Sequence, residues 1–277
     1  MKKIVKYATR QFLNRVLGTN RVKSIIKTTA KIAGIDLLSL AYDNMGILKY
    51  WNDEVSGESF VINSFLKERF QDRKDLILFD IGANVGTYSL ELCKTFPEAS
   101  IYAFEPNPNT FDILSQKLTN TDTKVNKIGF GSSSSRQKIY TYFDDPVSSH
   151  ASLYKDVLTE LHHANEVLEI EFEIRTIDDF CKMNTIDYID FLKIDTEGHE
   201  LEVLIGAKSM LSNGKIEVIQ FEFNEMNVVS RTFLKDFYDI LSNYDLCRLD
   251  SNKLIPLFKY ESRNEIFQFQ NFLATRR

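Results

Sequence analysis

Two acidic residues that each end a short apolar run are the first candidates for chemistry in this sequence. Asp80 follows Leu-Ile-Leu-Phe and precedes a turn with Gly82 and Gly86, and Glu105 follows Ile-Tyr-Ala-Phe. Glycines let the backbone approach a ligand closely, and the start of the helix that follows presents unpaired N–H groups. A carboxylate about 20 residues after such a turn is placed to accept hydrogen bonds from the hydroxyls of a ribose. The pattern therefore predicts a site for a nucleoside-containing ligand.

The spacing of the glycines narrows the class of ligand. In the Gly-x-Gly-x-x-Gly fingerprint of dinucleotide sites the second glycine leaves room for a pyrophosphate, but here Asn84 holds that position. Asp80 also suits an amino-bearing ligand better than a phosphate. Both features favour S-adenosylmethionine, which has no phosphate, over a nicotinamide cofactor, although the turn and the acid could have only structural roles. The expected donor contacts come from Asp80, Gly82, Ala83, Asn84, Gly86, Glu105 and Pro106.

A third apolar run ends in side chains suited to catalysis. The segment Ile-Asp-Thr-Glu-Gly-His places Asp195, Glu197 and His199 together, and ligands of open α/β sheets bind at the carboxyl ends of the strands. Methyl transfer needs the acceptor oxygen in line with the methyl group and the sulfur, and a base for the hydroxyl proton. We expect Asp195 to contact donor or acceptor, and His199, with an ordinary pKa of about 6.5, or Glu197 to accept the proton. The alternative is that Glu197 or His199 only anchors the following helix.

Alternating strand and helix patterns must position these residues. Alternation of this kind is typical of a parallel sheet. Apolar runs predict strands at 76–81, 100–105, 124–130, 191–195 and 218–223, and helical periodicity predicts helices at 86–95, 108–118 and 231–243. The segments 246–257 and 266–273 should close the sheet as an antiparallel pair. The less regular segment 131–176 is expected to form an insert on the substrate side.

Four blocks of sequence resemble the FkbM-type methyltransferases. They are Phe-Asp-Ile-Gly-Ala-Asn-Val-Gly-Thr-Tyr-Ser at 79–89, Phe-Glu-Pro at 104–106, Phe-Leu-Lys-Ile-Asp-Thr-Glu-Gly-His-Glu-Leu-Glu-Val-Leu at 191–204 and Phe-Glu-Phe-Asn at 221–224. The resemblance implies a class I methyltransferase fold, which is α/β and Rossmann-like, with a mostly parallel seven-stranded sheet and helices on both faces. It also implies S-adenosylmethionine-dependent O-methylation of a hydroxyl on a sugar, glycan or natural product. Because Lys127 departs from the family pattern after the third strand, the adenine contacts are not assigned.

Two further interpretations remain open. The first expectation is that no metal is bound, but Asp195, Glu222 and Asn224 resemble the ligands that hold Mg²⁺ in catechol-type O-methyltransferases. Three hard oxygen ligands suit Mg²⁺, which would lower the pKa of a bound diol; alternatively, Glu222 and Asn224 only bind loops. The second is a non-catalytic S-adenosylmethionine-binding or membrane-associated scaffold protein. The intact donor residues and the intact block after the fourth strand argue against the scaffold.

The charge distribution separates the start of the chain from the rest. Residues 1–35 contain nine Lys or Arg residues and no acid, so all 39 acidic residues follow them. The cations alternate with apolar residues at roughly helical spacing, and a basic amphipathic helix of this kind can lie on an anionic membrane surface; the other interpretation is a solvated cationic face packed on the acidic body. The acidic body makes nucleic acid an unlikely partner. We therefore expect a basic helical extension over 1–70 and a methyltransferase domain over 71–277 that includes the insert 131–176.

Bulk composition fits an ordinary soluble enzyme. The 277 residues are 43% hydrophobic and 26% charged, and three distant cysteines without metal-ligand spacing are typical of a reducing compartment. No apolar run approaches the roughly 20 residues that cross a bilayer. These features predict a cytoplasmic protein that can bind the inner face of the membrane.

Overall fold

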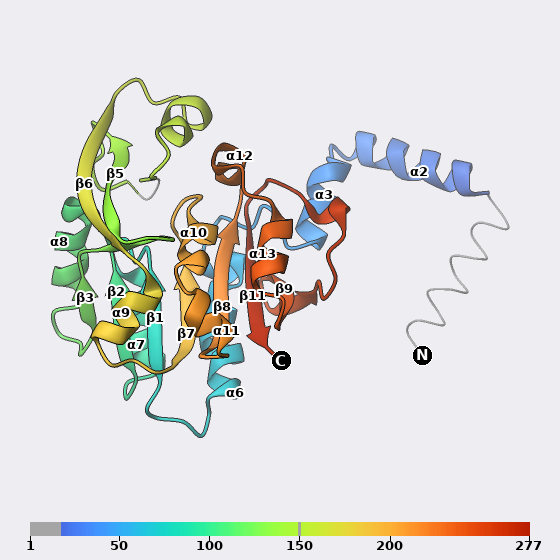
Figure 1. Ribbon diagram of the computed structural model, residues 1–277. Coiled ribbons are helices and arrows are strands. Elements are labelled where there is room, and N and C mark those ends of the chain that lie inside the picture. Colours follow the sequence, from blue (N-terminus) through green and yellow to red (C-terminus); the bar gives the residue numbers. More distant parts are fainter. Residues whose placement is uncertain (1–17, 149–150) are drawn as a thin grey trace. The chain divides into compact units, whose positions relative to one another are not determined.

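The computed structural model of the protein describes residues 18–148 and 151–277 (Figure 1). Contacts divide the chain into two compact units, residues 1–45 and residues 46–277. In the first unit, α2 (Thr19–Ile32) precedes α3 (Leu37–Asn44), which is capped by the Asp36 carboxylate. Of the basic segment 1–35, residues 1–17 lie outside the described residues. Within the described ranges, no helix combines the length and the apolar character that a membrane span requires.

The second unit is built on a mostly parallel sheet. Its described strands are β1 (Ile77–Ile81), β2 (Ser100–Phe104), β3 (Lys124–Asn126), β7 (Ile189–Ile194), β8 (Ile216–Phe223), β9 (Tyr244–Asp250), β10 (Lys253–Pro256) and β11 (Gln270–Arg276). They lie in the order β10-β9-β11-β8-β7-β1-β2-β3, with β11 antiparallel to both of its neighbours. This order confirms the class I Rossmann-like fold. The sheet has one strand more than expected because 246–257 forms a hairpin, whose second strand is β10, while β11 lies between β9 and β8.

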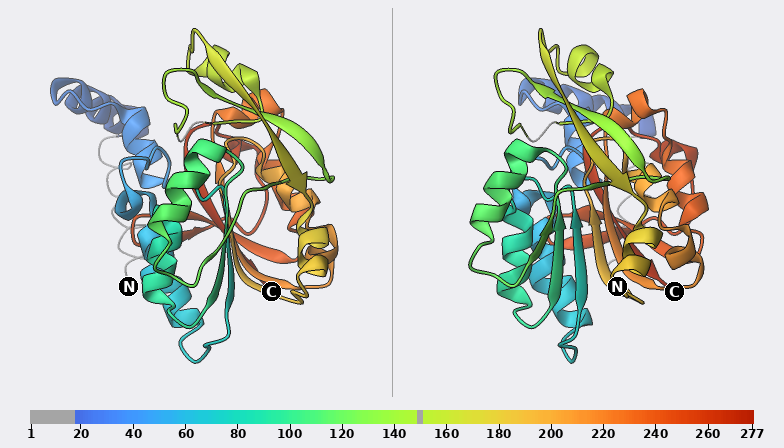
Figure 2. Two further views of the ribbon diagram at one scale, coloured as in Figure 1. Left: turned by 90° about the vertical axis from the view of Figure 1, so that its left-hand side faces the viewer. Right: turned by 60° about the vertical axis from the view of Figure 1, so that its left-hand side comes forward.

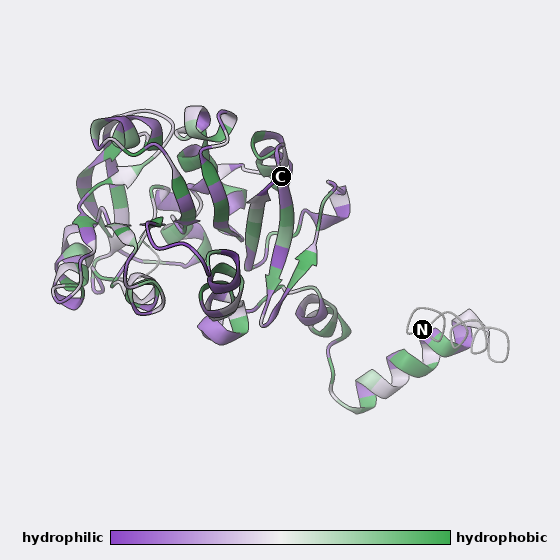
Figure 3. Ribbon diagram, turned by 90° about the horizontal axis from the view of Figure 1, so that it is seen from below, coloured by the Kyte–Doolittle hydropathy of each residue, from purple (hydrophilic) through white to green (hydrophobic). Residues whose placement is uncertain are grey.

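Helices cover both faces of this sheet, as the period-two alternation of its strands requires. On β1, Phe79 and Ile81 belong to one core cluster, and Leu78 belongs to another on the opposite face. The first cluster includes side chains of α9 (Ile177–Met183), α10 (Glu200–Ile205), α11 (Lys208–Ser212) and α13 (Leu234–Ile240). The second includes side chains of the π-helical segment Val61–Leu66 and of α7 (Thr87–Thr95), and α8 (Pro108–Lys117) packs beside it on Ala103. Apolar stretches in the strands are visible in Figure 3.

The division into compact units differs from the expected boundary at residue 70, because residues 46–70 belong to the second unit. This stretch comprises α4 (Asp53–Ser56), α5 (Glu58–Phe60), the π-helical segment and α6 (Lys67–Arg69). Val61, Ile62 and Leu66 are fully buried against the sheet. Burial of each such side chain contributes about 1.5–3 kcal/mol, so a domain beginning at residue 71 would lose part of its core. A helical pattern in the sequence could not reveal which unit its apolar face covers.

The insert forms a second, smaller sheet. Its strands are β4 (Gly129–Phe130), β5 (Ser135–Tyr142) and β6 (Val167–Arg175), in the order β4-β6-β5 (Figure 2). The expected third strand at 124–130 is therefore split, with β3 in the main sheet and β4 in the second. Ile139, Phe172 and Ile174 form a small core on one face of this sheet. The remaining short elements are the π-helical turn Val157–Leu161, α12 (Met226–Ser230) and the 3₁₀ turn Ser262–Asn264.

Candidate active site

A cavity lies at the carboxyl ends of the parallel strands, where the sequence places the site. Seven expected residues line it: Gly82, Asn84, Glu105, Pro106, Asp195, Glu197 and His199. The second sheet and its loops contribute apolar walls through Ile139, Ala151, Leu153 and Phe172. The insert therefore forms part of the cavity wall.

The turn after β1 is fixed by close backbone contacts. Gly82 has a φ of +77°, and a Cβ added there would lie 1.7 Å from the carbonyl oxygen of Asp195. The N–H groups of Gly82 and Ala83 both donate to the carbonyl oxygen of Phe104, at 3.0 and 2.9 Å. Asn84 also has a positive φ, of +48°. Glycine at position 82 is therefore needed because strands β1, β2 and β7 converge on this turn.

Glu105 is held in place by two backbone N–H groups. Its Oε2 accepts the N–H of Asn84 at 3.0 Å, and its Oε1 accepts the N–H of Asn107 at 2.9 Å. The side chain is largely buried, and this burial raises the pKa of Glu105 to about 7 in spite of the two hydrogen bonds. Each oxygen keeps a lone pair that can accept a ligand hydroxyl. The carboxylate is thus preoriented for a diol such as that of a ribose.

Asp80 supports the site from behind the turn. It is fully buried, and its Oδ2 accepts the hydroxyl of Ser89 in α7 at 2.5 Å. Its Oδ1 lies 3.9 Å from the Nζ of Lys193. Gly86 similarly serves packing, since a Cβ there would lie 2.6 Å from a methyl group of Leu114. The structure therefore favours positioning roles for Asp80 and Gly86 over the direct donor contacts expected from the sequence.

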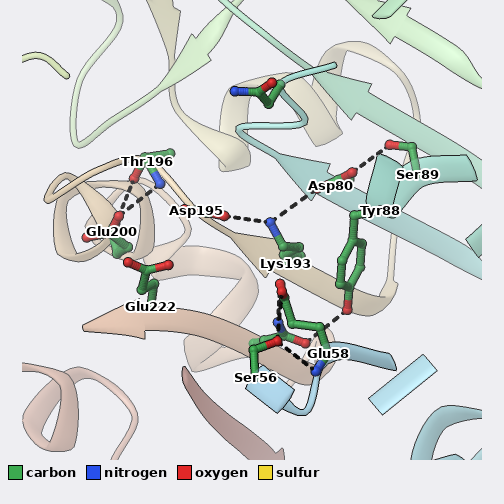
Figure 4. A network of polar contacts seen from close by, with 12 residues as sticks. Ser56, Glu58, Asp80, Tyr88, Ser89, Lys193, Asp195, Thr196, Glu200 and Glu222 are labelled. Carbon is green, nitrogen blue, oxygen red and sulfur yellow. Dashed lines mark hydrogen bonds and ion pairs between the residues drawn. The ribbon is translucent and has the colours of Figure 1, made fainter. Parts of the chain in front are cut away.

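Lys193 is a charged residue of the site that the sequence analysis did not single out. Its Nζ lies 2.9 Å from Oδ2 of Asp195 and 4.9 Å from the centre of the Tyr88 ring (Figure 4). Although burial opposes its charge, the carboxylates of Asp195, Asp80 and Glu58 raise the pKa of Lys193. The signal was available, because the strand expected at 191–195 puts the side chains of residues 193 and 195 on the same face.

The loop after β7 is shaped by Glu200. Its Oε1 accepts the N–H groups of Thr196 and Gly198, at 2.9 and 3.1 Å. Gly198 has a φ of +100° and packs against Met226, and Glu197 itself has a φ of +55°. A non-glycine residue with positive φ costs of order 1–3 kcal/mol and persists only where the surroundings hold it. Glu200 thus has the anchoring role that the sequence analysis considered for Glu197 or His199.

Glu197 lies in a strongly acidic environment. Burial raises the pKa of its carboxyl well above the usual range, and the charges of Asp195 and Glu200 raise it further. Its carbonyl oxygen accepts the hydroxyl of Ser152 at 2.8 Å, which links this loop to the insert. When it is ionised, a carboxylate with a raised pKa is a stronger base than an ordinary carboxylate.

His199 contacts the insert through its ring. Its Nδ1 lies 3.2 Å from the hydroxyl of Tyr154, and Gly131 approaches so closely that an added Cβ would lie 3.0 Å from Nε2. Burial lowers the pKa of His199, so the ring is neutral at neutral pH. These contacts place both ring nitrogens against the insert and favour a positioning role.

The candidate magnesium ligands are engaged in other contacts. Asn224 donates its side-chain N–H to Glu222 and accepts the N–H of Met226 at 2.8 Å. Asp195 is paired with Lys193. Over residues 18–148 and 151–277, no three His, Cys, Asp or Glu side chains are grouped to hold a metal ion. The arrangement favours the alternative in which Glu222 and Asn224 bind the loop after β8.

Several known methyltransferases are similar in sequence to this chain. Hexuronic acid methyltransferase AglP of Haloferax volcanii is 30% identical over 169 residues, which cover 60% of this chain and 63% of AglP. Methyltransferase sdnD of Sordaria araneosa is 30% identical, covering 47% of this chain and 60% of sdnD. The 2-O-methyltransferase NoeI of Sinorhizobium fredii is 22% identical, covering 63% of this chain and 74% of NoeI. The chain thus spans less than two thirds of the length of the first two relatives.

A model of a domain family also matches the central part of the chain. The methyltransferase FkbM domain matches residues 80–245, a range that begins at Asp80 and includes the turn, Glu105, the loop after β7 and the end of β8. This range is more than half of the chain and contains all three catalytic candidates. The chain therefore belongs to the FkbM methyltransferase domain family.

Proposed function

We propose that the protein is an S-adenosylmethionine-dependent O-methyltransferase whose acceptor is a hydroxyl of a sugar, glycan or natural product. The observation that carries this proposal is the geometry of Glu105, which is fixed by Asn84 and Asn107 at the wall of a cavity shared with Asp195 and Glu197. Membership of the FkbM family supports methyl transfer. The names of two relatives, a hexuronic acid methyltransferase and a 2-O-methyltransferase, support a hydroxylated acceptor.

In this proposal the adenosine of the donor occupies the cavity beside Glu105. The ribose hydroxyls donate to the Glu105 carboxylate, and the adenine ring contacts the apolar walls formed by Ile128 and Phe130. The Gly82 turn lets the sulfonium approach the backbone closely. The methyl group then points toward the loop that carries Asp195 and Glu197.

The chemical step is an in-line displacement. The acceptor hydroxyl oxygen attacks the methyl carbon, the carbon–sulfur bond breaks, and S-adenosylhomocysteine leaves with the electron pair of that bond. In its ionised form Glu197 accepts the hydroxyl proton at the cavity wall, and the burial that raises the pKa of its carboxyl favours the protonated product. Asp195 orients the acceptor, and His199 holds the insert in place through Tyr154.

Differential scanning with S-adenosylhomocysteine, NAD⁺ and buffer tests the proposed donor. At about 100 times its Kd, a ligand that binds only the folded state adds roughly 2.7 kcal/mol of stability. We expect S-adenosylhomocysteine alone to raise the melting temperature, whereas stabilisation by NAD⁺ instead would indicate an oxidoreductase. A screen of hydroxylated acceptors for donor turnover then separates an enzyme from a non-catalytic binding protein.

We further propose that the first unit contacts the anionic inner surface of a membrane. In α2, Lys23, Lys27 and Lys31 occupy one side of the helix at helical spacing. Ile25 and Ile26 lie on the other side and are 54% and 51% exposed, and hydrophobic and hydrophilic residues alternate along α2 in Figure 3. An apolar face beside lysines is typical of helices that lie in the interface of anionic bilayers.

A further inference from the structure

A second hollow lies on the other side of the Gly82 turn. It is lined by the turn itself, by Tyr88, Lys193 and Asp195, and by Asp53 and Glu58 from the segment before the sheet. Gly82, Asn84 and Asp195 line both this hollow and the main cavity. A ligand whose ribose lies at Glu105 therefore needs only to extend past the turn to reach the second hollow.

The segment 52–58 that walls this hollow is firmly built. The side chain of Asn52 caps α4 by accepting the N–H of Val55 at 2.9 Å. Gly57 has a φ of +88°, and an added Cβ would lie 2.7 Å from the carbonyl oxygen of Asp250. The hydroxyl of Ser251 donates to the carbonyl oxygen of Val55 at 3.0 Å. The segment is thus anchored on the hairpin between β9 and β10, and Asp53 and Glu58 are held at fixed positions.

The hollow combines charges of both signs. A chain of hydrogen bonds joins Tyr88 to Gln220 at 2.9 Å and Gln220 to Glu58 at 3.3 Å, and the second oxygen of Glu58 accepts the hydroxyl of Ser56 at 3.1 Å (Figure 4). The Lys193 ammonium also lines the hollow and is paired with Asp195. Two carboxylates near one ammonium complement a zwitterion, whereas the acids would repel a phosphate.

We propose that Asp53, Glu58 and Lys193 form the subsite for the α-amino acid end of the donor. Asp53 and Glu58 bind its ammonium, and Lys193 binds its carboxylate. This inference rests on the proposed function, in which the donor is S-adenosylmethionine. Asp53 and Glu58 lie before the range that matches the FkbM domain, residues 80–245, so this chain completes its donor site with residues from outside that range. The burial that raises the pKa of Glu58 to about 7 would be offset by a bound ammonium.

Titration calorimetry with two ligands tests this subsite. S-adenosylhomocysteine has the amino acid end, whereas 5′-methylthioadenosine has the same adenosine without it. We expect Glu58→Gln and Asp53→Asn each to lower the affinity for S-adenosylhomocysteine about tenfold, which corresponds to about 1.4 kcal/mol of binding free energy. The affinity of each variant for 5′-methylthioadenosine should change by less than about twofold. Glu54→Gln, an exposed neighbour on the same helix, is the matched control and should change neither affinity.

Each other outcome is decisive. Equal weakening of both ligands would show that the segment only supports the fold, and unchanged binding of both would show that the amino acid end lies elsewhere; either result overturns the inference. Asp53 is exposed, so its variant should fold even if Glu58→Gln lowers the melting temperature. Failure of the wild-type protein to bind either ligand would instead contradict the proposed function.

Discussion

Asn84 and Glu105 are joined by a hydrogen bond of 3.0 Å from the backbone N–H of Asn84 to Oε2 of Glu105. The two residues are 21 positions apart and follow different strands of the sheet. This bond links the glycine turn to the carboxylate that we propose binds the ribose. Because the carboxylate is oriented before a ligand arrives, less conformational freedom is lost on binding.

The closeness of Gly82 to β7 predicts a large effect of a small substitution. Gly82→Ala should lower the free energy of unfolding by about 1–3 kcal/mol more than Gly214→Ala, since a Cβ at residue 82 meets backbone. Gly214 is the matched control because its φ is also positive, at +63°, while its nearest neighbour is the flexible Arg276 side chain. Urea denaturation measures the free energy of unfolding of both variants. Equal losses would mean that the backbone at the turn relaxes freely.

The raised pKa of Glu105 predicts that adenosine binding depends on pH. The ionised carboxylate is the form that accepts the ribose hydroxyls, and its pKa of about 7 leaves most of it protonated at pH 6. The affinity for 5′-methylthioadenosine should therefore rise about tenfold between pH 6 and pH 8 and then level off. Glu105→Gln should flatten this profile. A wild-type affinity that is constant over this range would contradict the assigned role.

The base assignment predicts that Glu197 and His199 differ in their effect on rate. With an acceptor found by screening, Glu197→Gln should lower kcat by about 10²–10⁴-fold and leave S-adenosylhomocysteine binding unchanged. His199→Ala should resemble Tyr154→Phe, because both break the contact between the ring and the insert. If His199→Ala alone lowers kcat about 100-fold or more while Glu197→Gln is active, the histidine is the base.

The membrane proposal predicts that one face of α2 controls binding to lipid. Ile26→Glu should reduce co-sedimentation of the full-length protein with anionic vesicles, because it places a charge on the apolar face. Ser24→Glu adds the same charge among the polar residues and is the matched control. If both variants lose the same amount of co-sedimentation, the added negative charge and not the apolar face controls binding. If the wild-type protein does not co-sediment with the vesicles, the membrane proposal is wrong.

Local patterns in the sequence were sufficient to predict the turn, Glu105 and the positions of most parallel strands along the chain. These features depend on residues that are close in sequence or lie at the standard spacing of a βαβ unit. The positions of Glu58 and Gln220 could not be predicted, because they meet only when the segment before the sheet packs on β8. The role of Glu200 could not be predicted either, because its carboxylate binds the N–H groups of Thr196 and Gly198 only in the folded loop.

Calorimetric titration of S-adenosylhomocysteine into the wild-type protein and the Glu105→Ala variant tests the central claim most directly. Glu98→Ala removes an exposed carboxylate and serves as the control. The wild type and the control should bind alike, and Glu105→Ala should bind more weakly by about 1.5–3 kcal/mol, the value of a hydrogen bond to a charged group. Equal affinity of Glu105→Ala and wild type, or no binding by any of the three, would contradict the assignment of this cavity as a donor site.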